Sequence, residues 1–400
     1  MRDYTPVMKP YKTVLFLGDG MADEPVAELG RRTPLQVAQT HHMDAIARLG
    51  RSGSMLTLPD GFPTSSDVAN MSVLGCNLAT EMCGRGPLEA VGQGIKLRPD
   101  DIVFRMNLVS VDAAGILRDF SGGHILQADA EEAVRLLNEN LGSEKVRFYA
   151  GVSYRNLLVL SGSEFSANIS YDKPDDNHGE TVAKHMPRTK SNEGIHTADV
   201  LRELIERAAK VLAGREANNI WPWSGGKAGA LHNLCERYGV RAAVISAVDV
   251  INGLGACLGM DVIRVPGATG YIDTNYEGKA DAALKALADG YDFIYVHVEA
   301  IDEVSHAQDL LLKIRAIEDF DRRLVGRVMK AAGPDVAYCV LPDHPVPLAT
   351  GKHTRTPVPV AVYQPDVEPD GIESFDEISA PQGALGRFRG SGLMDLLLKS

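Results

Sequence analysis

Four short runs of apolar and β-branched residues limit what this chain can fold into. They are Thr13–Leu17, Phe293–Val298, Val336–Leu341 and Val358–Tyr363. From Leu310 to Lys330, between the second run and the third, apolar residues recur at helical spacing, and this pattern ends at Gly333 and Pro334. Alternation of strands and helices predicts an α/β fold, with a doubly wound and mostly parallel sheet.

The middle of the chain has a different character. Polar, glycine-containing segments run from about Pro87 to Trp223, and helical patterns occur near 131–141 and 197–213. Residues suited to chemistry lie before position 90 and after position 300. We therefore predict a discontinuous catalytic domain made of residues 10–86 and 224–400, with a smaller α+β domain inserted at 87–223.

Charge and composition exclude several classes of protein. The formal net charge is −12, from 41 Lys and Arg against 53 Asp and Glu, which disfavours nucleic-acid binding but not a small anionic substrate. No apolar run is long enough for a membrane span, and Met1–Pro10, expected to be a short mobile tail, lacks the core of a secretory signal. Five cysteines without a close pair are typical of reduced thiols, and we expect a cytoplasmic protein.

Residues of types that commonly bind metal ions follow three of the predicted strands. They are Asp19 after the first strand, Asp302 and His306 after the second, and Asp343, His344 and, soon after, His353 following the third. Sites in open α/β sheets collect outside the carboxyl ends of the strands, so these six side chains should converge. Any one of these fragments alone is more often a turn or a surface pair, but their joint appearance indicates a metal centre.

The spacing and the donor types narrow the choice of ion. On a helix, Asp302 and His306 would share one face, with their Cβ atoms about 5–6 Å apart. The candidate ligands are carboxylates, imidazoles and a hydroxyl, without a cysteine. This set favours Mn²⁺, Zn²⁺, Mg²⁺ or Co²⁺ over iron–sulfur or Cu(I) sites.

A candidate nucleophile lies at Ser66, where Ser66 and Asp67 lead into the apolar stretch 68–74. A serine here suits the start of a helix, where it can cap free backbone amides. The same position also suits phosphoryl transfer, because a helix N-terminus stabilises phosphate and a nearby ion activates a hydroxyl. The residues alone leave both interpretations open.

The motifs together resemble the cofactor-independent phosphoglycerate mutases of the alkaline-phosphatase superfamily, and most closely their short, archaeal-type branch. The matching segments are Gly18–Met21, Ser66–Ala69, Gly84–Ala90, Phe120–His124, Gly151–Arg155, Trp221–Trp223, Asp302 with His306, Asp343 with His344, and Gly351–His353. They run in order through nearly the whole chain.

This resemblance implies a phosphatase-like domain with an inserted transferase domain and two Mn²⁺-type ions. One ion would be bound by Asp302, His306 and His353, and the other by Asp19, Ser66, Asp343 and His344. Ser66 would take the phosphoryl group of 3-phosphoglycerate as a phosphoserine and return it to give 2-phosphoglycerate, a step of glycolysis, without 2,3-bisphosphoglycerate. His124, Arg155 and Lys227 would bind the substrate.

The identity of the phosphoryl acceptor stays open. Asn70 stands where many relatives have a histidine, so a phosphatase, or a phosphotransferase that acts on another alcohol such as homoserine, remains the alternative. A nucleotide-dependent kinase or dehydrogenase is disfavoured. No glycine-rich fingerprint follows the first strand, and the segments 226–228 and 351–353 do not complete a phosphate-binding loop.

Overall fold

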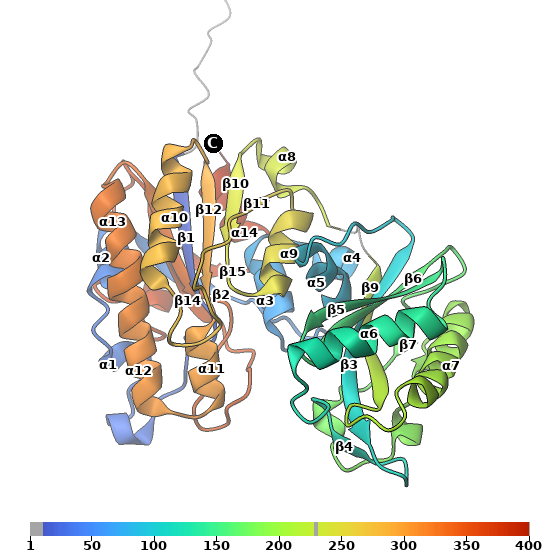
Figure 1. Cartoon of the computed structure of the whole chain (residues 1–400). Coiled ribbons are helices and arrows are strands. Elements are labelled where there is room, and N and C mark those ends of the chain that lie inside the picture. Colours follow the sequence, from blue (N-terminus) through green and yellow to red (C-terminus); the bar gives the residue numbers. More distant parts are fainter. Residues whose placement is uncertain (1–10, 228–230, 400) are drawn as a thin grey trace, which may run out of the picture. The chain divides into compact units, whose positions relative to one another are not determined.

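The computed structural model describes residues 11–227 and 231–399, so the expected tail at Met1–Pro10 lies outside the described residues (Figure 1). The chain divides into two compact units. The first unit comprises Met1–Met82 and Leu231–Ser400, and the second comprises Cys83–Ala230. Within the described ranges, no helix is both long enough and apolar enough to cross a membrane.

An eight-stranded sheet, counted over the described residues, forms the centre of the first unit. Its strands, in spatial order, are β11 (Asp261–Val262), β10 (Ala242–Ile245), β12 (Phe293–Val298), β1 (Thr13–Gly18), β13 (Ala337–Pro342), β14 (Val358–Tyr363), β2 (Arg51–Met55) and β15 (Gly386–Phe388). The strands from β11 to β13 are all parallel, whereas β14 runs antiparallel to both of its neighbours. The predicted α/β class and the mostly parallel sheet are confirmed.

The four predicted strands all exist. β12 and β14 have the predicted limits, while β1 extends one residue further, to Gly18, and β13 is shifted by one residue. All residues of β1, β12 and β13 are buried. Parallel strands covered on both faces have continuous apolar sequences rather than alternating ones, which explains why these runs could be recognised.

Helices cover the sheet of the first unit (Figure 1). They are α1 (Pro34–Val37), α2 (His41–Leu49), α3 (Ser66–Val73), α4 (Leu78–Glu81), α8 (Leu234–Tyr238), α9 (Asp249–Cys257), α10 (Tyr276–Ala288), α11 (Ala300–His306), α12 (Leu310–Asp319), α13 (Gly326–Ala332) and α14 (Gly392–Leu398). The helix predicted at 310–330 is present as α12 and α13, joined by a π-helical segment at Phe320–Val325. Apolar residues of α2, α10, α12 and α13 pack on one face of the sheet and form the main core.

The second unit is an antiparallel sheet with helices. Its elements are α5 (Arg85–Gly92), β3 (Asp101–Val111), β4 (Leu117–Asp119), α6 (Gln127–Leu141), β5 (Val146–Val152), β6 (Arg155–Ser161), β7 (Ile169–Ser170), β8 (Arg188–Thr189), α7 (Ile195–Val211) and β9 (Asn219–Lys227). β3 lies between β6 and β9. Helices α6 and α7 pack on one face of this sheet and α5 on the other, which gives the unit its own core.

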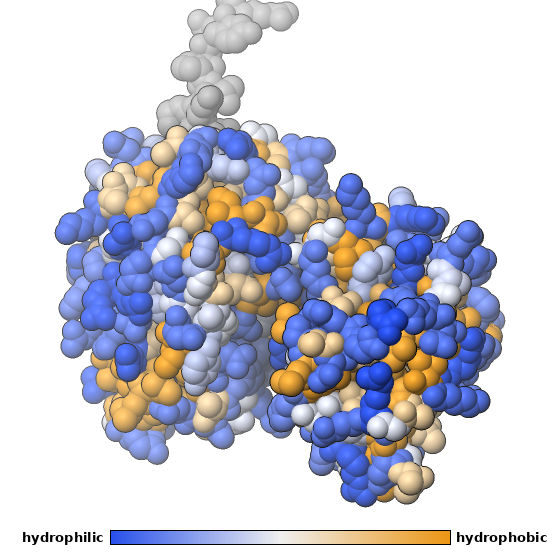
Figure 2. Space-filling view, in the orientation of Figure 1, coloured by the Kyte–Doolittle hydropathy of each residue, from blue (hydrophilic) through white to orange (hydrophobic). Residues whose placement is uncertain are grey.

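The surface agrees with the acidic, polar composition. Figure 2 shows a face on which hydrophilic residues predominate and apolar residues form separate groups.

Candidate active site

The ends of three neighbouring strands bring the predicted ligands together. Gly18, the last residue of β1, pairs with Val298 at the end of β12 and with Pro342 at the end of β13. Residues that follow these strands therefore leave the sheet at the same edge. The backbone N–H of Gly20 donates to Asp343 Oδ1 at 3.1 Å, which links two of the three strand ends directly.

Gly20 allows the third strand end to approach. Its φ of +63° lies in the left-handed region, and a Cβ at this position would lie 2.6 Å from Asp302 Oδ1. Asp302 is on the first turn of α11, directly after β12. A side chain at position 20 would thus push Asp302 away from the strand ends, so glycine is required for the approach.

The six predicted ligands form one cluster in the first unit. Among these six residues, potential donor atoms lie within 4.8 Å of one another in two groups, which are Asp302, His344 and His353, and Asp19, Asp343 and His344. His306 joins the first group, with its Nε2 atom 3.2 Å from Asp302 Oδ2 and 2.9 Å from His353 Nε2. His344 belongs to both groups, so the two are contiguous.

Ser66 lies beside this cluster. Its Oγ atom is 3.2 Å from His344 Nε2, and Ser66 is the first residue of α3. Ser65, not Ser66, occupies the N-cap position, and the side chain of Ser65 makes no capping hydrogen bond. The capping role considered from the sequence is therefore not used, and the hydroxyl of Ser66 faces the candidate ligands instead.

The electrostatics of the cluster call for a cation. Burial and the neighbouring carboxylates of Asp343 and Asp302 raise the pKa of Asp19 well above its usual value. Burial raises the pKa of Asp343 to about 7, and burial lowers the pKa of His344 to about 3. Buried acids beside one another are costly unless a positive charge compensates them.

Buried carboxylate oxygens that accept no hydrogen bond also indicate that the cluster binds a cation. Asp19 Oδ1 and Asp302 Oδ1 are buried and have no hydrogen-bond donor among the described residues. The side chain of Asp302 also lies within 3.4 Å of the Nε2 atoms of both His306 and His353. His306 Nδ1 lies 2.8 Å from the carbonyl oxygen of Gly351, and a proton on Nδ1 leaves the lone pair of Nε2 directed at the cluster. Carboxylate oxygens and imidazole nitrogens that converge in this way fit divalent metal ions.

A buried histidine supports Asp19 and was missed by the sequence reasoning. His297 lies inside β12, with Nε2 3.0 Å from Asp19 Oδ2 and Nδ1 3.1 Å from Ser246 Oγ. Burial lowers the pKa of His297 to about 3, so the ring is neutral and donates one hydrogen bond to the carboxylate. The sequence feature that could have indicated this role is a histidine within an otherwise apolar predicted strand.

Asn70 supports Asp343 in a comparable way. Its Nδ2 atom donates to Asp343 Oδ2 at 3.0 Å and to the carbonyl oxygen of Ser66 at 2.8 Å. The hydroxyl of Tyr295 donates to the Asn70 side-chain oxygen. Asn70 is fully buried, so it fixes the carboxylate of Asp343 relative to the start of α3.

The three predicted substrate-binding residues all lie in the second unit. His124, in a left-handed turn with φ of +54°, lines a cavity of about 440 Å³. Arg155 begins β6, and the preceding Ser153 donates to the carbonyl oxygen of Ile125 at 2.6 Å, so the two segments lie side by side. Lys227 lies apart from them.

The register of β3 shows this separation. Lys227 pairs with Ile102, whereas Arg155 pairs with Asn107, five residues further along β3. Five residues of a strand correspond to about 17 Å. The Nζ atom of Lys227 lies 3.3 Å from Asp100 Oδ1 on the surface. Lys227 therefore lies apart from the adjoining segments that carry His124 and Arg155.

The raised pKa of Asp19 predicts an unusual effect on stability. When all metal is removed, Asp19→Asn should unfold at a higher temperature than the wild type at ~pH 8, and the difference should shrink toward ~pH 5. A carboxyl with a raised pKa holds its proton more tightly in the folded state, so the wild type loses stability as the pH rises. Asparagine carries no charge and keeps an oxygen for His297.

Thermal unfolding in EDTA at the two pH values measures this difference. A lower melting temperature for Asp19→Asn at the higher pH would show that the buried carboxylates do not repel one another.

Known proteins resemble the chain over nearly its full length. Residues 11–400 match the family described as the Metalloenzyme superfamily. A protein of Methanosarcina acetivorans, named 2,3-bisphosphoglycerate-independent phosphoglycerate mutase, is 45% identical over 97% of this chain and 100% of its own length. A protein of the same name from Methanosarcina mazei is 44% identical, with 97% and 100% covered.

Solved structures agree in fold. A protein from Pyrococcus horikoshii superposes with a TM-score of 0.82 at 26% identity, covering 97% of both chains. A cofactor-independent phosphoglycerate mutase from Thermoplasma acidophilum superposes with a TM-score of 0.67 at 28% identity, covering 97% of this chain and 100% of that one.

Proposed function

This chain belongs to the Metalloenzyme superfamily and, within it, to the 2,3-bisphosphoglycerate-independent phosphoglycerate mutases, and we propose that it interconverts 3-phosphoglycerate and 2-phosphoglycerate. The observation that carries the proposal is the hydroxyl of Ser66, 3.2 Å from His344 within a buried cluster of carboxylates and imidazoles. Such an arrangement suits transfer of a phosphoryl group to and from a serine.

We propose that the cluster holds two divalent ions, with Mn²⁺ favoured among ions that prefer oxygen and imidazole ligands. The ligand sets are Asp302, His306 and His353 for one ion, and Asp19, Ser66, Asp343 and His344 for the other. When bound, such ions neutralise phosphoryl charge and lower the pKa of a hydroxyl. The buried oxygens of Asp19 and Asp302 that accept no hydrogen bond support this assignment.

In the proposed reaction, Ser66 Oγ attacks the phosphorus of the substrate. The ester bond between phosphorus and the substrate oxygen breaks, the Oγ–P bond forms, and the proton of Ser66 passes on balance to the released hydroxyl. The reverse transfer to the other hydroxyl of glycerate gives the product. Because the N-cap residue Ser65 makes no side-chain hydrogen bond to α3, the amides of the first turn are suited to bind phosphoryl oxygens.

We assign the chemistry to the first unit and substrate binding to the second, inserted unit. The guanidinium of Arg155 suits bidentate binding of a carboxylate or phosphate, and His124 suits proton transfer at a glycerate hydroxyl. Their neighbouring segments, joined through Ser153 and Ile125, support a shared role. Lys227, which lies apart on β9, would act on the substrate only as a more distant charge.

An assay of the purified protein tests this function. With Mn²⁺ and without bisphosphoglycerate, we expect 3-phosphoglycerate to be converted to 2-phosphoglycerate with no loss of organic phosphate. Release of inorganic phosphate without 2-phosphoglycerate would instead identify a phosphatase. Transfer only to an added alcohol such as homoserine would identify another phosphotransferase.

The contact of His297 with Asp19 predicts a weaker metal site when this histidine is replaced. His297→Leu should raise the dissociation constant for Mn²⁺ about 10- to 100-fold, because residues that orient a ligand contribute this much to metal affinity. His185, which pairs with Asp172 in the second unit, provides the control variant His185→Leu. Isothermal titration with Mn²⁺ measures both variants, and equal affinities in them would remove His297 from the metal site.

A further inference from the structure

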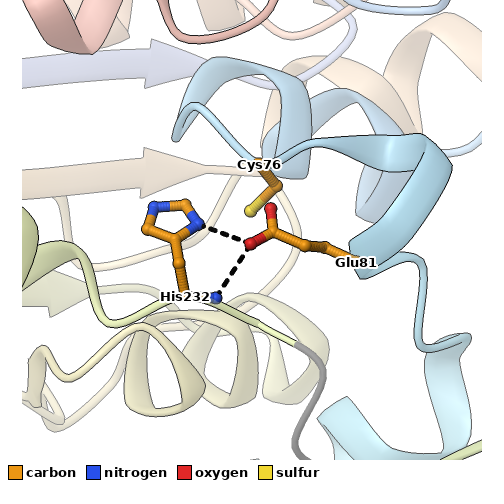
Figure 3. Close-up of side chains that lie close together, drawn as sticks. All are labelled: Cys76, Glu81 and His232. Atoms are coloured by element: carbon orange, nitrogen blue, oxygen red, sulfur yellow. Dashed lines mark hydrogen bonds and ion pairs between the residues drawn. The ribbon is translucent and has the colours of Figure 1, made fainter.

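A second group of potential metal ligands lies in the first unit, separate from the candidate active site. Cys76, Glu81 and His232 each offer a donor atom within 4.8 Å of the others. Figure 3 shows the sulfur of Cys76 and the carboxylate of Glu81 on the same side of the His232 ring, facing Nδ1. None of these three residues belongs to the cluster around Ser66.

Local structure holds the three side chains in place. Cys76 follows α3, where its N–H donates to the carbonyl oxygen of Met71 at 2.9 Å. Glu81 ends α4 and accepts the backbone N–H of Asn77, which caps the start of the same helix. Glu81 Oε1 also accepts the backbone N–H of His232 at 3.0 Å. Ligands fixed before binding lose little conformational freedom when an ion arrives.

The contact between Glu81 and His232 also has a purely structural use. Glu81 Oε1 lies 3.0 Å from His232 Nδ1, so a proton on Nδ1 can be shared by these two groups. This pairing accounts for two of the three residues. The thiol of Cys76, which is only 2% exposed, lies close to both of them. A divalent ion in place of the shared proton would use all three donors.

We propose that Cys76, Glu81 and His232 bind one divalent ion of the zinc type. A thiolate, a carboxylate and an imidazole are ligands that Zn²⁺ accepts, and the sulfur distinguishes this set from the oxygen and imidazole set around Ser66. One thiolate and one carboxylate cancel the charge of the ion. Binding releases the thiol proton, while the proton of His232 moves from Nδ1 to Nε2.

The positions in the chain suggest what this ion does. Glu81 precedes Met82, the last residue of the first segment of the unit, and His232 follows Leu231, the first residue of its second segment. An ion bound by both residues cross-links the two segments at the points where the chain leaves the first unit and returns to it. Because the ion binds only when both segments are in place, such a cross-link would stabilise the folded state of the first unit.

Cobalt absorption tests the site selectively. Co²⁺ bound to a thiolate gives an intense charge-transfer band in the near ultraviolet, and the cluster around Ser66 has no cysteine to produce one. When metal-free protein is saturated with Co²⁺, we expect a band whose intensity corresponds to one thiolate-bound Co²⁺ per chain, and added Zn²⁺ should abolish it. Absence of the band in the wild-type protein would overturn the proposal.

Variants identify the ligands. Cys76→Ser should lose the band, whereas Cys257→Ser, which changes a thiol on α9 outside the group, should keep it. Glu81→Gln, which can still accept the hydrogen bonds, should raise the Co²⁺ concentration for half-maximal absorbance at least about tenfold. An undiminished band in Cys76→Ser, or an unchanged midpoint in Glu81→Gln, would exclude these residues as ligands.

Discussion

Ser66→Ala should reduce the rate of phosphoglycerate interconversion by about 10⁴-fold or more, because loss of a covalent nucleophile removes the reaction path itself. The Oγ atom of Ser66 lies next to the metal cluster, and alanine deletes only that atom. The substitution is at the partly buried start of α3 and removes no capping hydrogen bond, so the fold should persist.

The adjacent serine gives a matched control. Ser65 is the N-cap residue of α3, yet its side chain makes no capping hydrogen bond, so Ser65→Ala should keep activity within a few-fold of the wild type. Coupled measurement of 2-phosphoglycerate formation compares the two variants. If Ser66→Ala retained more than about a tenth of the activity, direct transfer without a serine ester would be the better mechanism.

Removal of metal should stop the reaction and also weaken the fold. Without ions, the buried carboxylates of Asp19 and Asp343 have raised pKa values, which reflects the cost of keeping them charged. We expect exhaustive chelation to lower the rate to background, and Mn²⁺ to restore it. At a Mn²⁺ concentration of about 100 times its dissociation constant, the stability gain should be about 2.7 kcal/mol.

Metal analysis must accompany this test, because tightly bound ions survive short treatment with EDTA. A protein shown to be free of metal that still interconverted the phosphoglycerates at full rate would contradict the assignment of the cluster. A protein whose melting temperature did not respond to Mn²⁺ would contradict the electrostatic account.

Much of the metal cluster could be predicted from local sequence. Runs such as Phe293–Val298 are recognisable because central parallel strands are apolar on both faces. Asp302 and Asp343 directly follow such runs, and parallel strands end at a common edge of the sheet. These two facts predict that the ligands which follow the strands lie close together, and the structure brings all six ligands into one cluster.

Other parts of the site depend on packing between distant segments. Asn70 is hydrogen-bonded to Asp343, which is 273 positions away, and His297 contacts Asp19, which is 278 positions away. The spacing of residues in the sequence therefore predicts neither contact. The sequence shows Asn70 only as a departure from relatives, whereas its hydrogen bonds to Asp343 and to Ser66 depend on the folded structure. The register that separates Lys227 from Arg155 includes a β-bulge in the pairing of β3 with β9, which local patterns do not reveal.

The group of Cys76, Glu81 and His232 could not be recognised in the sequence either, because one of its members is far from the other two along the chain. Cys76 and Glu81 are close in sequence, but His232 lies 151 positions after Glu81, beyond the whole inserted unit. Sequence spacing reveals metal sites when ligands come in short motifs, and here the third ligand is remote.

Identification of the phosphorylated residue tests the central claim most directly. Protein loaded with Mn²⁺ is mixed with 3-phosphoglycerate, quenched in acid within the first turnovers, digested, and examined by mass spectrometry for phosphopeptides. The account predicts phosphate on the peptide that contains Ser66, at Ser66 itself, and its disappearance in Ser66→Ala. Rapid turnover with no phosphate on Ser66, or with phosphate on another residue, would contradict it.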